Sequence, residues 1–198
     1  MSWSLLVSVA VFSFVTSVTP GPNNTFLLSS GANFGLRKSL PYLNGIMVGL
    51  AGMMIALGAG LGVIFTTLPL VYQVLKWVGF GYIVWLAFQI VKSTSKSETA
   101  EPKYIGFAKA TTFQFVNPKA WVVVASFMAT SVPVGSGLVA TAYICLVFLL
   151  FTYPGALLWA VAGQVLKTWL SDTIRRRVFN IVASILLVLS MVPVLFFH

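Results

Sequence analysis

The chain has 198 residues, of which 59% are hydrophobic and 8% are charged, and its mean hydropathy is +0.97. Soluble domains carry about a quarter charged residues, so this composition indicates a membrane protein and excludes an ordinary water-soluble domain. The formal net charge of +9 predicts no nucleic-acid partner, because the 12 basic residues are scattered over short loops and form no basic, aromatic face. A lipid bilayer is the expected partner.

Six apolar runs of membrane-spanning length follow one another, at about 4–31, 40–67, 69–91, 108–130, 135–165 and 175–197. The first run lacks a basic leader and a convincing cleavage site, so we interpret it as an uncleaved helix. We therefore expect an all-α membrane protein with six transmembrane helices. A single domain, 1–198, would consist of repeat one (1–92), a cytoplasmic connector (93–107) and repeat two (108–198).

The basic residues predict the orientation of these spans. Ten of the 12 lie in the three loops that follow spans one, three and five: Arg37, Lys38, Lys92, Lys96, Lys103, Lys109, Lys167, Arg175, Arg176 and Arg177. The opposite side has only Lys76. The positive-inside rule then places those three loops in the cytoplasm and both termini outside. Three spans per half also make the halves inverted repeats.

The first span contains a double-proline motif that predicts a broken helix. Its residues are Thr19, Pro20, Gly21, Pro22, Asn23 and Asn24. Each proline lacks an N–H, so the carbonyls of Thr16 and Val18 should be left free. Gly21 permits a positive φ, and a new helix with unpaired N–H groups should begin at Asn23. The alternative is a kink that only shapes the helix bundle.

The second span is rich in glycine, including the pairs Gly45-x-x-x-Gly49 and Gly58-x-x-x-Gly62. Small residues at this spacing let two helix backbones approach closely. We favour tight packing within one chain. The alternative is that these glycines form the interface of a homodimer.

A second break is predicted in the first span of repeat two, at Gln114, Asn117, Pro118 and Lys119. Pro118 should free the carbonyl of Gln114. Lys119 lies roughly 15–18 Å along its span, where a charged side chain is costly and therefore indicates function. No Asp or Glu lies in a span, so water, carbonyl groups or a substrate carboxylate must pair with it. Alternatively, its side chain snorkels to the lipid headgroups.

Together the two breaks predict a binding site for a small zwitterion, with carbonyl acceptors for an ammonium and N–H donors for a carboxylate. The candidate substrate-binding residues are Thr19, Pro20, Gly21, Pro22, Asn23, Asn24, Gln114, Asn117, Pro118 and Lys119. We predict no catalytic residue, metal or cofactor, because one terminal histidine and three peripheral acids assemble no nucleophile–base pair.

There are two alternatives to a function in solute transport. A membrane redox or metal-handling protein needs paired cysteines or His/Asp/Glu ligands within its spans, whereas this chain has one cysteine, Cys145. A non-transporting accessory subunit would not need a lysine at membrane depth.

Several motifs resemble the LysE/RhtB family of bacterial amino-acid exporters, and most closely its cysteine/O-acetylserine branch. They are Thr19-Pro20-Gly21-Pro22-Asn23, the glycines at 31, 35, 45 and 49, Trp77-Val78-Gly79-x-x-Tyr82-Ile83-Val84-Trp85-Leu86-Ala87, and Phe113-Gln114-Phe115-Val116-Asn117-Pro118-Lys119-Ala120.

This resemblance implies an inner-membrane secondary transporter that exports amino acids, commonly by using the proton gradient. Members that export lysine or arginine tend to carry an acid in the second helix, and Gly49-Leu50-Ala51-Gly52 has none. Small neutral substrates of the cysteine, O-acetylserine, homoserine or threonine type are therefore expected. A proton-driven carrier usually holds an Asp, Glu or His within its spans, and this chain has none there. Whether export is coupled to proton antiport therefore stays open.

Overall fold

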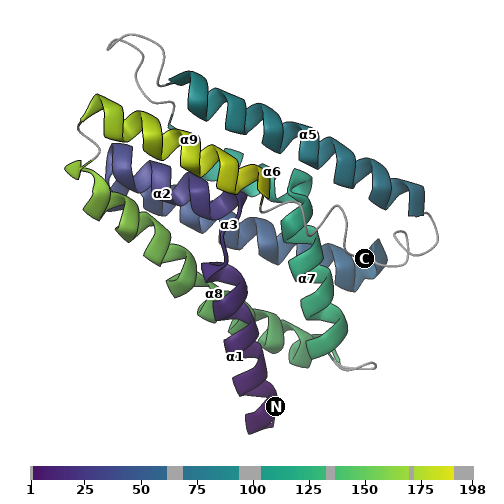
Figure 1. The fold of residues 1–198 in the computed structure, drawn as a ribbon. Coiled ribbons are helices and arrows are strands. Elements are labelled where there is room, and N and C mark those ends of the chain that lie inside the picture. Colours follow the sequence, from purple (N-terminus) through teal and green to yellow (C-terminus); the bar gives the residue numbers. More distant parts are fainter. Residues whose placement is uncertain (1, 62–68, 94–103, 133–136, 170–171, 190–198) are drawn as a thin grey trace.

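The computed structural model describes residues 2–61, 69–93, 104–132, 137–169 and 172–189 (Figure 1). Every regular element within these ranges is helical, which confirms the all-α prediction for this part of the chain. In chain order the elements are α1 (Trp3–Val18), α2 (Pro22–Phe34), α3 (Leu36–Ala56), a π-helical turn η1 (Leu57–Leu61), α5 (Pro69–Ser93), α6 (Phe107–Val116), α7 (Pro118–Ser131), α8 (Leu138–Leu166) and α9 (Thr173–Leu189).

Two of the described helical segments, Leu36–Ala59 and Leu138–Leu166, are long and apolar enough to cross a membrane. The pair α1 and α2 forms a third candidate span if it is taken as one helix, bent by 61° at its break. The arrangement of six spans in two inverted repeats stays a prediction, as does the division at the connector 93–107.

Helix α8 packs along both α1 and α2, so one continuous helix supports both sides of the first break (Figure 1). Glycines bring the backbones together. A methyl group at Gly31 would overlap the Ala160 carbonyl, and one at Gly163 would overlap the Leu28 carbonyl. Because only glycine fits at such contacts, they fix the position of α2 against α8.

A second close contact joins α3 to α6, the helix that leads into the second break. A methyl group at Gly45 would collide with the Phe107 carbonyl, and one at Gly49 with the Gln114 side chain. Thr111 Oγ1 also donates to the Gly45 carbonyl at 3.1 Å. The favoured interpretation of these two glycines, tight packing within one chain, is therefore confirmed.

The largest apolar core joins α1, α7 and α8 through three aromatic rings. The Phe127 and Phe148 ring centroids are 4.3 Å apart, and the Phe12 centroid is 6.3 Å from that of Phe127. Helices α5 and α9 pack together at a separate, smaller cluster around Ile83 and Ala87. The main core therefore surrounds the two breaks, whereas α5 and α9 lie beside it (Figure 1).

Candidate functional site

The first break is a short extended segment between α1 and α2. α1 ends at Val18, and Thr19 (φ −67°, ψ 128°) and Gly21 (φ −178°, ψ 177°) both have extended backbones. α2 begins at Pro22, one residue earlier than expected, because a proline at the first helical position loses no intrahelical hydrogen bond. The double-proline motif therefore separates two helices rather than kinking one.

Gly21 has a different role from the one expected. Its φ of −178° is extended backbone that any residue can adopt, so the positive φ that glycine permits is not used. Space is the reason for glycine here: a Cβ at this position would lie 2.7 Å from Nζ and 2.9 Å from Cδ of Lys119. Gly21 therefore leaves room for the lysine side chain to reach the break.

The second break is one residue long. Asn117 (φ −88°, ψ 104°) ends α6 and caps α7, accepting the Lys119 backbone N–H on Oδ1 at 3.2 Å. Pro118 is the first residue of α7. The Asn117 N–H donates to the Gln114 carbonyl at 3.1 Å, so the expectation that this carbonyl would be free is wrong. The chain closes this break locally, with its own neighbouring groups.

The ammonium of Lys119 connects the two breaks. Nζ donates to the carbonyl of Thr19 at 3.0 Å and to that of Pro20 at 2.6 Å. Carbonyl groups are thus the partner that the ammonium uses, although they are not the Thr16 and Val18 carbonyls expected from the prolines. The lysine does not snorkel away from the break, and its hydrogen bonds are the strong, charge-assisted kind.

A pair of side-chain amides forms a second connection. Asn23 Nδ2 donates to Gln114 Oε1 at 2.8 Å, and Gln114 Nε2 donates back to Asn23 Oδ1 at 3.0 Å. Gln114 Nε2 also donates to the Ala110 carbonyl at 2.9 Å, and the Gln114 side chain is completely buried. This pair holds the start of α2 against the end of α6.

Further side chains satisfy carbonyls that the breaks expose. Asn24 Nδ2 donates to the Ser17 carbonyl at 2.8 Å and to the Thr19 carbonyl at 2.7 Å. Trp121 Nε1 donates to the Phe115 carbonyl at 2.9 Å. Irregular backbone at membrane depth is tolerated when protein groups pair with it in this way.

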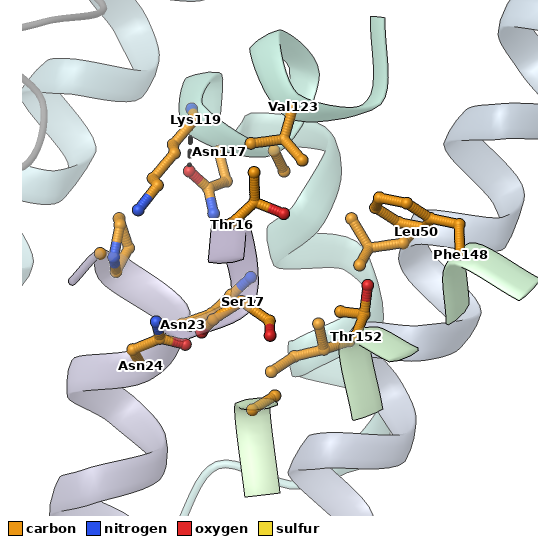
Figure 2. A pocket seen from close by; sticks show the side chains of 15 residues that line it. Thr16, Ser17, Asn23, Asn24, Leu50, Asn117, Lys119, Val123, Phe148 and Thr152 are labelled. Atoms are coloured by element: carbon orange, nitrogen blue, oxygen red, sulfur yellow. Dashed lines mark hydrogen bonds between the residues drawn. The ribbon is translucent and has the colours of Figure 1, made fainter. Parts of the chain in front are cut away.

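A cavity of about 60 Å³, with room for a few water molecules, lies between the breaks and α8. One side is polar and the other is mostly apolar (Figure 2). The lining residues are Thr16, Ser17, Gly21, Pro22, Asn23, Asn24, Ile46, Leu50, Asn117, Lys119, Ala120, Val123, Phe148, Thr152 and Ala156. Lys119 is the only ionisable side chain among them.

The structure brings the ten candidate residues into one region but gives them different positions. Those that line the cavity are Gly21, Pro22, Asn23, Asn24, Asn117 and Lys119. Thr19 and Pro20 present their carbonyls to Lys119, whereas Gln114 and Pro118 shape the second break. Their role in binding a substrate stays a prediction.

Sequence reasoning missed the wall of the cavity that α8 supplies. Phe148, Thr152 and Ala156 follow at intervals of four residues, so they share one face of the helix. The available signal was the interruption of an apolar span by Thr152 and by the dipeptide Pro154-Gly155. A proline and a polar residue in one apolar span give the same kind of signal that identified the two breaks.

The sequence matches known proteins over almost its whole length. The family model described as LysE type translocator matches residues 14–195. The cysteine/O-acetylserine efflux proteins of Escherichia coli (strain K12) and Salmonella typhimurium (strain LT2) are each 31% identical over 198 residues, covering 99% of this chain and 100% of theirs. No solved structure matches the chain. The chain therefore belongs to the LysE-type translocator family and is a membrane transporter rather than an enzyme.

Proposed function

We propose that this chain exports small neutral amino acids or their derivatives, of the cysteine, O-acetylserine, homoserine or threonine type, across the bacterial inner membrane. Family membership and the printed names of the relatives support the substrate class. The observation that carries the proposal is the contact of the Lys119 ammonium with the Thr19 and Pro20 carbonyls, beside a cavity that suits a small solute.

That contact has the chemistry of a zwitterion site. Carbonyl groups that accept hydrogen bonds from Lys119 can equally accept them from the ammonium of an amino acid. The displaced lysine then faces the carboxylate of the same amino acid. Asn117 adds a donor, because its Nδ2 donates to no protein acceptor in the described part of the chain. When the amino acid binds, the carbonyls would exchange the Lys119 ammonium for the substrate ammonium, and Lys119 would pair with the substrate carboxylate. No charge would be left unpaired.

The rest of the lining favours a neutral side chain. No acidic residue lines the cavity, so a lysine or arginine substrate would bring a second positive charge beside Lys119 without a counter-charge. Isolated charges are costly at membrane depth. Ile46, Leu50 and Phe148 instead offer apolar surface to a short side chain.

The contacts between the two breaks support a transport role for the site. The Lys119 contact and the Asn23–Gln114 pair each connect a residue of the first break with one at the second, and would therefore connect the two proposed repeats. In the proposed topology, with six spans as inverted repeats and both termini outside, rocking of one repeat against the other would break and remake these contacts. If a proton is exchanged, Lys119 and the substrate itself are the groups available to carry it.

Overproduction in bacteria tests the proposal. We expect a small neutral or sulfur-containing amino acid to accumulate outside cells that carry the wild-type chain. Lys119→Ala should abolish this rise, because it removes the ammonium from the site. Lys109→Ala is the matched control, because Lys109 lies exposed on α6, outside the cavity. No rise in any extracellular amino acid with the wild-type chain would overturn the proposal.

A further inference from the structure

Thr152 carries a buried hydroxyl group that has no hydrogen-bond partner in the described part of the chain. Its side chain is 6% exposed, and its Oγ1 makes no hydrogen bond. The other two hydroxyl groups that line the cavity are both satisfied by their own helix: Thr16 donates to the Phe12 carbonyl at 2.8 Å and Ser17 to the Phe14 carbonyl at 2.7 Å. Buried polar groups without partners are rare and call for an explanation.

The location of this hydroxyl supplies the explanation. Thr152 lies on the α8 side of the cavity, near Leu50 and Phe148 and across from the first break (Figure 2). It is the only polar residue that α8 and α3 contribute to the lining. The cavity therefore has a charged, amide-rich end at the two breaks and a single unpaired hydroxyl group in its apolar wall.

We propose that Thr152 Oγ1 hydrogen-bonds the polar side-chain atom of the transported amino acid, and so selects a hydroxyl, thiol or acyl oxygen over an apolar group of equal size. The inference rests on the proposed function, which places the ammonium and carboxylate of the substrate at the breaks. The substrate side chain then extends toward α8. A threonine hydroxyl can donate or accept, so it suits each of these groups.

Selection of this kind is stronger than selection by shape. A site built to hydrogen-bond a substrate discriminates against the analogue that lacks the group, because its own polar atom is then left unpaired. An apolar wall alone would accept both the polar substrate and its apolar analogue. The alternative occupant of the cavity is a water molecule that pairs with Thr152 whatever the substrate.

Two pairs of amino acids with nearly equal shapes separate these possibilities. Proteoliposomes that contain the purified protein are loaded with cysteine and 2-aminobutyrate, or with threonine and valine, and the efflux of both members is measured. We expect the wild-type chain to prefer the polar member of each pair by about tenfold, the effect of one hydrogen bond. Thr152→Val should reduce that ratio to about one, and Thr152→Ser should keep most of it.

Thr130→Val is the matched control, because the Thr130 hydroxyl donates to the Ser126 carbonyl within its own helix and lies outside the cavity. Its ratio should equal that of the wild type. Melting temperatures of the purified proteins give a second readout. Thr152→Val should melt at or above the wild-type temperature, because it removes a buried hydroxyl that has no partner.

The outcomes distinguish the two proposals. Efflux of none of the four amino acids by the wild-type chain would overturn the proposed function. Efflux with an unchanged ratio in Thr152→Val would overturn only the role of Thr152 and would favour the water. A Thr152→Val chain that fails to accumulate in the membrane, or melts well below the wild type, would also contradict the inference, because an unpaired hydroxyl cannot be essential for folding.

Discussion

The two helix breaks satisfy their own backbone groups in different ways. At the second break, Asn117 caps α7 with its side chain and gives its N–H to the Gln114 carbonyl, so the chain closes the gap with neighbouring residues. The first break has no side-chain cap on α2. Its Pro20 carbonyl accepts from Lys119, about a hundred residues away, and its Thr19 carbonyl accepts from both Lys119 and the nearby Asn24.

This difference gives each break its own part in the site. A break that is closed locally can hold a charged side chain at a fixed place, as the second one holds Lys119. A break whose carbonyls depend on a distant group can exchange that group for another donor. The first break should therefore be the part of the site that responds to substrate, and the second should be the rigid part.

The largest effect on export is expected from a substitution at the first break. In Gly21→Ala, the added methyl group would occupy the space of the Lys119 tip and displace the ammonium from the Thr19 and Pro20 carbonyls. Because the tip is flexible and the Gly21 backbone is extended, folding should be little affected. Export should fall at least about tenfold, the effect of one charge-assisted hydrogen bond.

Efflux from proteoliposomes measures this effect, with the melting temperature as the check on folding. Gly81→Ala on α5 is the matched control, since nothing lies within 4 Å of a Cβ added there. Wild-type efflux by Gly21→Ala would show that the lysine contact is not needed, and the two breaks would then not depend on each other in transport.

A smaller effect is expected on stability at the second break. Asn117→Ala removes the side-chain cap of α7, which costs about 1 kcal/mol for a typical helix. In a chain of this size that corresponds to a fall of about 2–4 °C in melting temperature. Differential scanning calorimetry of the purified protein measures it.

Asn33→Ala is the control for that substitution, because the Asn33 side chain is exposed and, among the described residues, bonds only to Ser29 within its own helix. Melting of Asn117→Ala at the wild-type temperature would mean that the second break is not closed by its cap, and the contrast between the breaks would be lost.

The positions of the breaks could be predicted from sequence because proline acts locally. A proline removes its own N–H wherever the chain places it, and Pro20, Pro22 and Pro118 also stand beside glycine or asparagine, so these segments predicted the interruptions. Proline alone is not sufficient, because Pro41 and Pro154 lie inside the continuous helices α3 and α8. The depth of Lys119 and the absence of acids from the spans also come directly from the sequence. Together these features predict a polar site between broken helices.

The partners within the site could not be predicted in the same way, because they depend on tertiary packing. Nothing local shows that the Lys119 ammonium contacts the Thr19 and Pro20 carbonyls, or that Gly21 leaves space for it. The unpaired hydroxyl of Thr152 is also a property of packing, since a threonine in a helix ordinarily bonds to its own backbone.

We expect an amino acid to take over both partners of the Lys119 contact, with its ammonium at the carbonyls and its carboxylate at the lysine. Calorimetric titration of the purified protein tests it most directly, with cysteine, with cysteamine, which lacks the carboxylate, and with N-acetylcysteine, which lacks the ammonium. We expect the wild-type protein to bind cysteine but neither of the other two ligands, and Lys119→Met to lose the binding of cysteine. Equal binding of all three ligands, or wild-type affinity for cysteine in Lys119→Met, would contradict it.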